Sequence, residues 1–268
     1  MTSETKTYTL ILVRHGQSSF NVSSQFAGWI DAPLSTIGVN EAINAGRLIG
    51  QYDLKPDKVY TSRLSRTIKT ANIILSEIDR LWIDVSRSWR LNERHYGVLQ
   101  GKKKNEVLQQ YGLEKFKKWR RNYNYPPPAL EEGKDSSISD ERYKDIEKLE
   151  GVKLPRSESL KQVIDRLVPF FNSSIVPDLK SGKSVLVVCH GTSLRALIKY
   201  LSNISSEDIE NINIPTAIPL VYKLTEDENG DLKPIQERFY LDEEAAKRGA
   251  EKVAAQGMPE PQDTRAFL

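Results

Sequence analysis

The 268-residue sequence has very little cysteine and no long apolar run, and each absence excludes a class of protein. Its single cysteine, Cys189, excludes an internal disulfide and is typical of a reducing compartment. No apolar run approaches the roughly 20 residues that cross a bilayer. The first ten residues lack the apolar core of a signal peptide. We therefore expect a cytoplasmic protein without a membrane span.

An excess of charge of one sign is also absent. The 39 Lys and Arg residues stand against 36 Asp and Glu residues, which leaves a formal net charge of +3. This near balance does not indicate general binding of polyanions. The basic clusters at 102–104 and 115–121 alone would favour nucleic acid, but the acidic segment at 131–135 opposes it. We expect no nucleic-acid partner.

What the sequence does contain is an alternation of short β-branched runs with helical patterns. We expect strands at 9–13, 58–62, 82–85, 184–189 and 218–224. Ser35 and Ser159 are suitable N-caps for two of the intervening helices. The pattern predicts an α/β three-layer sandwich, in which helices flank a mostly parallel central sheet.

The domain organisation follows from where this pattern is interrupted. Between 102 and 154 the sequence is polar, then proline-rich, then acidic, without a clear core period. We expect one catalytic domain over 1–255, in which 102–154 is a surface excursion over the site. The residues from 256 to 268 are predicted to form a flexible tail.

Two of the three histidines occupy matching positions. His15 and His190 each follow an apolar strand and precede a glycine, in "LILVRHG" and "VLVVCHG". Ligands of parallel sheets bind beyond the carboxyl ends of the strands, so adjacent strands would bring the two imidazoles together. One such histidine would more often be structural, but two in the same context favour a catalytic pair.

Arginines near the same strand ends indicate what the histidines act on. Arg14, Arg63, Arg66 and Arg195 all lie close to a predicted strand end. Guanidinium groups suit phosphate or carboxylate, and like charge lowers the pKa of a nearby imidazole, which leaves it neutral and nucleophilic. We expect one imidazole to attack phosphorus while the other stabilises the developing charge.

A proton donor for the departing oxygen is offered by Glu93 in the turn-prone segment "LNERHYG". Bound phosphate anions would raise the pKa of its carboxyl group. A raised pKa suits a residue that donates one proton and recovers it.

Several motifs resemble those of the cofactor-dependent phosphoglycerate mutases of the histidine phosphatase superfamily. In order, between about residues 8 and 255, they are "RHGQSSFN", "TSRLSRTIKTA", "WRLNERHYGVLQGK", "WRRNYNYPPP", "ESLKQVIDRL" and "CHGTSLR". The resemblance implies interconversion of 3- and 2-phosphoglycerate in glycolysis and gluconeogenesis, through a phosphohistidine primed by 2,3-bisphosphoglycerate and without a metal. It also implies small phosphorylated three-carbon acids as partners and a homo-oligomer, either a dimer or a tetramer.

The resemblance assigns roles to individual positions. His15 would be phosphorylated, His190 would be the second imidazole and Glu93 the proton donor, with Arg14 and Arg66 completing the catalytic set. The implied substrate-binding residues are Arg14, Asn21, Ala27, Gly28, Arg66, Glu93, Arg94, His95, Tyr96, Lys104, Arg120, Arg121, Gly191 and Thr192.

Two of these positions differ from the family pattern. Ala27 replaces a usual Ser or Thr, and Thr192 replaces a usual Asn. Each change would remove a hydrogen bond to a charged ligand worth about 1.5–3 kcal/mol, which predicts lower efficiency with unchanged chemistry. A phosphatase of the same superfamily and a weakly active paralogue that binds phosphoglycerates are the alternatives. Lys104, Arg120 and Arg121 favour the mutase, because they add cations for a second anionic group.

Overall fold

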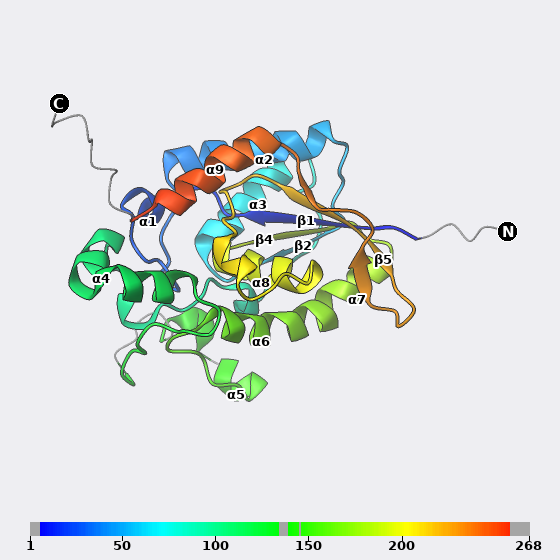
Figure 1. The fold of residues 1–268 in the computed structure, drawn as a ribbon. Helices are drawn as coiled ribbons and strands as arrows, with labels where there is room; N and C mark the ends of the chain where they lie inside the picture. Colours follow the sequence, from blue (N-terminus) through cyan, green and yellow to red (C-terminus); the bar gives the residue numbers. More distant parts are fainter. Residues whose placement is uncertain (1–5, 134–138, 145, 258–268) are drawn as a thin grey trace, which may run out of the picture.

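A computed structural model describes residues 6–133, 139–144 and 146–257 and shows an α/β fold in three layers (Figure 1). A seven-stranded sheet forms the middle layer, with the order β3-β2-β4-β1-β5-β6 and with β7 paired to β5. Helices lie on both faces of this sheet, which confirms the predicted fold class.

Four strands on one side of the sheet are parallel to one another. They are β1 (Tyr8–Arg14), β2 (Lys58–Thr61), β3 (Val85–Arg87) and β4 (Val185–Cys189). The pairings β2–β3, β2–β4 and β1–β4 are all parallel. Every residue of β4 is buried, as expected for a parallel strand covered on both faces.

The other strands run antiparallel, so the sheet is mixed. They are β5 (Leu220–Glu226), β6 (Leu232–Pro234) and β7 (Phe239–Tyr240). β5 pairs antiparallel with β1, β6 and β7. The strand predicted at 218–224 is therefore present, but it extends the sheet in the opposite direction.

Alternate residues of β1 face the two helical layers. Ile11 and Val13 belong to one buried cluster, and Leu10 and Leu12 belong to the other. The helices of the first layer are α2 (Thr36–Gln51) and α3 (Ser65–Glu77), and those of the second are α6 (Leu160–Phe170), α7 (Val176–Lys180) and α8 (Gly191–Leu201). The remaining helical segments are α1 (Ser19–Val22), α4 (Lys104–Arg121), α5 (Ile146–Glu150), α9 (Glu243–Ala255), a π-helical turn (Phe171–Ile175) and 3₁₀ turns at Trp89–Leu91, Gly97–Leu99, Glu141–Tyr143 and Asp208–Asn211.

The predicted helix starts are confirmed. The Ser35 hydroxyl accepts a hydrogen bond from the Gly38 amide at 3.0 Å. Ser159 and Gln162 form a reciprocal capping box at the start of α6. Both caps satisfy amides that the first helical turn leaves without an intrahelical partner.

The third strand lies further along the chain than predicted. β3 covers Val85–Arg87 rather than 82–85, and its pairing begins with Val85 opposite Val59. Trp82 is 75% exposed and carries the Arg80 guanidinium over its ring. The apolar residues at 81–82 therefore lie on the surface and do not begin a strand.

The excursion from 102 to 154 has more structure than the sequence pattern indicated. About a third of it is α4, which is interrupted at Gly112, where φ is 79°. Phe116 and Trp119 of α4 pack with Phe26 in a small buried cluster. The interruption at Gly112 and the many charged residues of α4 hide its apolar face from a periodicity argument.

Within residues 6–133, 139–144 and 146–257, no helix combines the length and the apolar character that a membrane crossing requires.

Candidate active site

The carboxyl ends of β1 and β4 place His15 and His190 side by side. The parallel register sets Arg14 opposite Cys189, so the residues that follow are neighbours. The centroids of the two imidazole rings are 5.0 Å apart and the ring planes meet at 64°. This geometry confirms the expectation that the two strand ends bring the histidines together.

His15 is held in one tautomer and lines a cavity. Its Nδ1 lies 2.7 Å from the Gly16 carbonyl oxygen, which can only accept, so Nδ1 carries the hydrogen and Nε2 keeps its lone pair. Burial, and then the charges of Arg66 and Arg14, hold the pKa of His15 well below its usual range. The side chain is therefore neutral at pH 7, with a free nucleophilic nitrogen.

His190 is fully buried and lines neither of the two cavities at the site. Its Nε2 lies 2.8 Å from the Ser62 hydroxyl, whereas its Nδ1 has no hydrogen-bond partner among the described residues. Burial, followed by the charges of Arg66 and then His15, lowers the pKa of His190 well below its usual range.

Two buried arginines flank the histidines and are held by backbone carbonyl groups. Arg66 donates from Nη1 to the Ile30 oxygen and from Nη2 to the Gly28 oxygen, each at 2.9 Å. Arg14 donates from Nη1 to the Ile214 oxygen at 2.7 Å. The Nε atoms of both arginines are buried without a partner in the described part of the chain. Burial lowers the pKa of Arg66 only to about 10, so it stays charged at pH 7.

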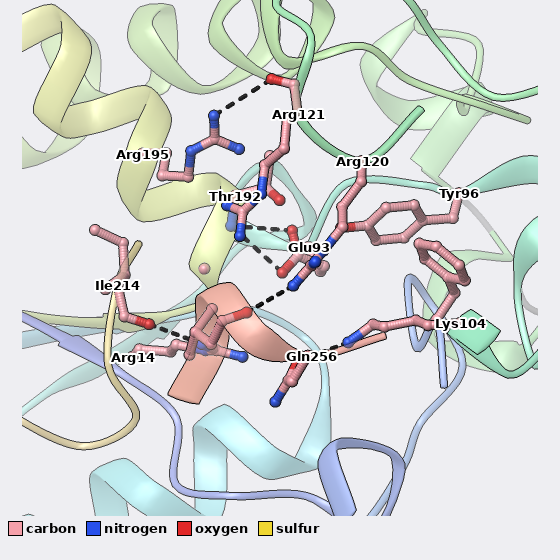
Figure 2. Close-up of a pocket in the computed structure, with 13 residues that line it drawn as sticks. Arg14, Glu93, Tyr96, Lys104, Arg120, Arg121, Thr192, Arg195, Ile214 and Gln256 are labelled. Atoms are coloured by element: carbon pink, nitrogen blue, oxygen red, sulfur yellow. Dashed lines mark hydrogen bonds between the residues drawn. The ribbon is translucent and has the colours of Figure 1, made fainter. Parts of the chain in front are cut away.

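Further cations converge on the same space from α4 and α8 (Figure 2). Arg120 donates from Nη2 to the Val253 carbonyl at 2.6 Å, at the end of α9. Lys104 donates to the Gln256 side-chain oxygen at 2.7 Å. Burial lowers the pKa of Arg120 and of Arg195 to about 9, so both remain charged at pH 7.

Glu93 is the one carboxylate among the described residues that line the two cavities. Its Oε1 accepts the Arg94 amide at 2.8 Å and the Thr192 amide at 3.2 Å. Its backbone oxygen accepts the indole N–H of Trp29 at 2.7 Å. These contacts hold the carboxylate within the group of cations drawn in Figure 2.

Most of the predicted site residues meet at these two adjoining cavities. The predicted residues that line them are Arg14, His15, Asn21, Ala27, Gly28, Arg66, Glu93, Tyr96, Lys104, Arg120, Arg121, Gly191 and Thr192.

The side chains of Arg94 and His95 do not reach the cavities. Arg94 is fully buried and donates to the Trp119 and Arg120 carbonyl groups at 2.8 and 3.0 Å. The ring of His95 is also fully buried, and it lies 5.6 Å from that of Trp29. The two residues follow Glu93 in the sequence, but their side chains are buried in the protein interior and do not line either cavity.

Sequence reasoning missed some contributors. Ser62 contacts His190 and is the last residue of the strand predicted at 58–62, which is a usable signal. Gln256 contacts Lys104 although the tail was expected to be flexible from this residue onward, and no motif marks it. Residues 258–268 of the predicted tail lie outside the described residues.

Comparisons with known proteins agree with this fold. The model of the histidine phosphatase superfamily (branch 1) matches residues 10–138 and 135–232. The solved structure named Mycobacterial hydrolase 1 superposes with a TM-score of 0.66 at 19% identity, over 88% of this chain and 100% of that one. At this identity the likeness shows the fold alone.

Two curated relatives are much more similar in sequence. The 2,3-bisphosphoglycerate-dependent phosphoglycerate mutase of Bifidobacterium longum is 52% identical over 253 residues, which cover 94% of this chain and 99% of the relative. Phosphoglycerate mutase 1 of Saccharomyces cerevisiae is 53% identical over 249 residues, which cover 92% of this chain and 98% of the relative. The chain therefore belongs to the histidine phosphatase superfamily and, within it, to the family of these phosphoglycerate mutases.

Proposed function

We propose that the protein is a 2,3-bisphosphoglycerate-dependent phosphoglycerate mutase, which interconverts 3- and 2-phosphoglycerate in glycolysis and gluconeogenesis. The observation that carries the proposal is a neutral His15, with Nε2 unprotonated, beside His190 and among cations. Relatives more than 50% identical over more than 90% of this chain are named for this activity, which supports the proposal.

In the proposed reaction His15 is the nucleophile. Its Nε2 lone pair forms a bond to phosphorus as the bond from phosphorus to the departing oxygen breaks. Arg14 and Arg66 donate to the phosphoryl oxygens, whose negative charge they stabilise during transfer. Glu93 gives a proton to the departing oxygen and takes it back from the attacking hydroxyl group in the return step.

The described residues fit an anion that carries more than one charged group. The buried Nε atoms of Arg14 and Arg66 lack acceptors among these residues, and the basic side chains of Lys104, Arg120 and Arg121 line the same adjoining cavities. These residues would hold the phosphates and carboxylate of 2,3-bisphosphoglycerate. When bound, that compound supplies the phosphoryl group that first charges His15. Gly28, Gly191 and the Thr192 backbone would complete the lining.

The proposal extends to the whole chain. Residues 1–255 would form one catalytic domain, in which 102–154 covers the site. The enzyme would be cytoplasmic, would act on small phosphorylated three-carbon acids and would assemble as a dimer or tetramer, as the family resemblance implies. Size measurement by light scattering tests the assembly.

The test is a coupled assay of isomerisation, with and without 2,3-bisphosphoglycerate, run in parallel with an assay of free phosphate. We expect isomerisation that requires the primer and acid-labile labelling that the His15→Ala variant loses. Phosphate release without isomerisation would identify a phosphatase instead. Ligand binding with neither reaction would identify a paralogue without catalysis. Labelling that persists in His15→Ala would place the nucleophile elsewhere.

A further inference from the structure

A chain of buried hydrogen bonds lies behind His190. Its Nε2 is 2.8 Å from the Ser62 hydroxyl, which is 2.7 Å from the Thr67 hydroxyl. The Thr67 hydroxyl is in turn 2.8 Å from the Leu64 carbonyl oxygen. The side chains of His190, Ser62 and Thr67 are completely buried, so no bulk water competes for these bonds.

The donor in each of these hydrogen bonds can be assigned by starting from the last acceptor, the Leu64 carbonyl oxygen. The Leu64 carbonyl can only accept, so Thr67 uses its one hydroxyl hydrogen there. Ser62 therefore donates to Thr67, and its oxygen also accepts the Leu64 amide at 3.1 Å. The remaining partner, Nε2 of His190, must then be the donor to Ser62. The reverse order would leave two oxygens 2.8 Å apart with no hydrogen between them.

The two catalytic imidazoles are thus held in opposite tautomers. The Gly16 carbonyl keeps the hydrogen of His15 on Nδ1, whereas the Ser62 hydroxyl keeps that of His190 on Nε2. A neutral His190 therefore has an unprotonated Nδ1, the atom that has no partner among the described residues. An unprotonated nitrogen cannot donate to a phosphate oxygen, and its lone pair repels one.

We propose that Ser62 is a positioning residue, which fixes the hydrogen of His190 on Nε2 so that His190 assists phosphate only after it takes up a proton on Nδ1. The inference rests on the proposed function for one assumption, namely that the anion binds at His15. Binding of a doubly charged anion is then coupled to the uptake of a proton.

The charges around His190 make this coupling strong. Arg66 from α3, Arg14 from β1 and Arg166 from α6 all disfavour a positive charge on the His190 ring, as does His15. Glu93, which the Thr192 amide holds, is the carboxylate of the same site. A bound dianion reverses the sign of the local field and stabilises the protonated ring. Because the anion binds together with one proton on His190, its affinity should fall about tenfold for each pH unit above the pKa of His190 in the free enzyme.

The first experiment reads the tautomer directly by NMR of the enzyme with ¹⁵N-labelled histidine. The chain has only three histidines, and the variants His15→Gln and His95→Gln assign their signals. In the wild type we expect the His190 hydrogen on Nε2. In Ser62→Ala we expect a shift toward Nδ1, and Ser62→Thr should retain the wild-type tautomer. A hydrogen on Nδ1 in the wild type, or no change in Ser62→Ala, would overturn the proposal.

The matched control is Ser202→Ala, at the opposite end of the helix that follows His190. Its hydroxyl meets that of Tyr222 at 2.9 Å, so the variant removes a partly buried hydroxyl without touching the imidazoles. We expect the same His190 signals as in the wild type. A tautomer shift in Ser202→Ala as large as that in Ser62→Ala would assign the effect to general loosening and overturn the role of Ser62.

The second experiment measures proton uptake when sulfate binds, by calorimetry in buffers with different ionisation enthalpies. Sulfate is a dianion that does not itself titrate between pH 7 and 8. We expect the wild type to take up about one proton more per sulfate than Ser62→Ala does, and the variant to show a flatter dependence of affinity on pH. Any proton taken up by Lys104 is common to both proteins and cancels.

Equal proton uptake in the wild type and in Ser62→Ala would refute the coupling. Neither experiment measures turnover, so both stay informative if the mutase assay fails. If sulfate binds and His190 has the expected tautomer but isomerisation is absent, the proposed function fails and the role of Ser62 stands.

Discussion

The carboxyl ends and the amino ends of the parallel strands both carry many charged side chains, but the cations at the two ends have different hydrogen-bond partners. At the amino ends cations meet carboxylates: Lys183 contacts Asp178 at 2.7 Å, and Arg80 contacts Asp57 at 3.2 Å. At the carboxyl ends the cations of the site contact peptide oxygens or side-chain amides in the described part of the chain.

This difference separates a structural arrangement of charge from a functional one. A carboxylate cancels a full positive charge, whereas a carbonyl oxygen orients a guanidinium group and leaves its net charge in place. Burying such uncancelled charge costs free energy, and a bound anion recovers part of that cost. The site therefore holds its cations in position for a ligand, whereas Lys183 and Arg80 at the opposite end are already paired with carboxylates.

The largest expected effect comes from removing the Glu93 carboxylate, the only one among the described residues of the lining. Glu93→Gln should lower kcat by about 10²–10⁴-fold, because the amide cannot transfer a proton. The same variant should bind sulfate more tightly, because the positive charge of the site rises by one. The matched control is Glu226→Gln at the other end of the sheet, which should leave both quantities unchanged. Weaker sulfate binding by Glu93→Gln would contradict the charge comparison.

An intermediate effect is expected from the anion itself. Sulfate at a hundred times its dissociation constant should raise the free energy of unfolding by about 2.7 kcal/mol, which thermal unfolding measures. Chloride at equal ionic strength separates binding from screening. Arg66→Lys should reduce the stabilisation, because a compact ammonium group cannot span the two carbonyl oxygens and the anion as the forked guanidinium does. Arg80→Lys, from the paired end, should preserve it.

The smallest effect is expected at the amino ends. Lys183→Ala should lower the melting temperature by no more than about 2–4 °C and leave kcat unchanged. Burial raises the pKa of Asp178, but hydrogen bonds from Lys183 and Tyr60 lower it by more. The pKa therefore lies below its usual value of 3.8. The contribution of this pair is therefore present above pH 3.8 and lost as the pH falls through the lower value. A loss of turnover in Lys183→Ala would show that the two ends are not independent.

The parts of the site that lie on regular structure could be predicted from the sequence. His15 and His190 follow strands whose apolar runs are unmistakable, and the parallel register fixes their proximity. Glu93 could be found from its turn-prone setting, but the neighbouring Arg94 and His95 turn into the packing, and sequence adjacency does not reveal this.

The parts that depend on long-range contacts could not be predicted. α4 has few apolar positions and a break at Gly112, so its burial follows from neighbours such as Phe26 that are far away in sequence. The contact between Gln256 and Lys104 spans 152 residues and carries no pattern. The antiparallel direction of β5 is likewise a matter of topology, since its apolar run would suit either direction.

The use of peptide oxygens as anchors has a consequence for sequence change. A backbone oxygen is present whatever side chain a position bears, so replacement of Ile30, Ile214 or Val253 preserves the anchor if the chain keeps its path. Side-chain substitutions in the loops around the pocket should therefore leave its positive charge and the positions of its cations unchanged. An insertion or deletion that reroutes one of those loops would disturb it more than any point substitution there.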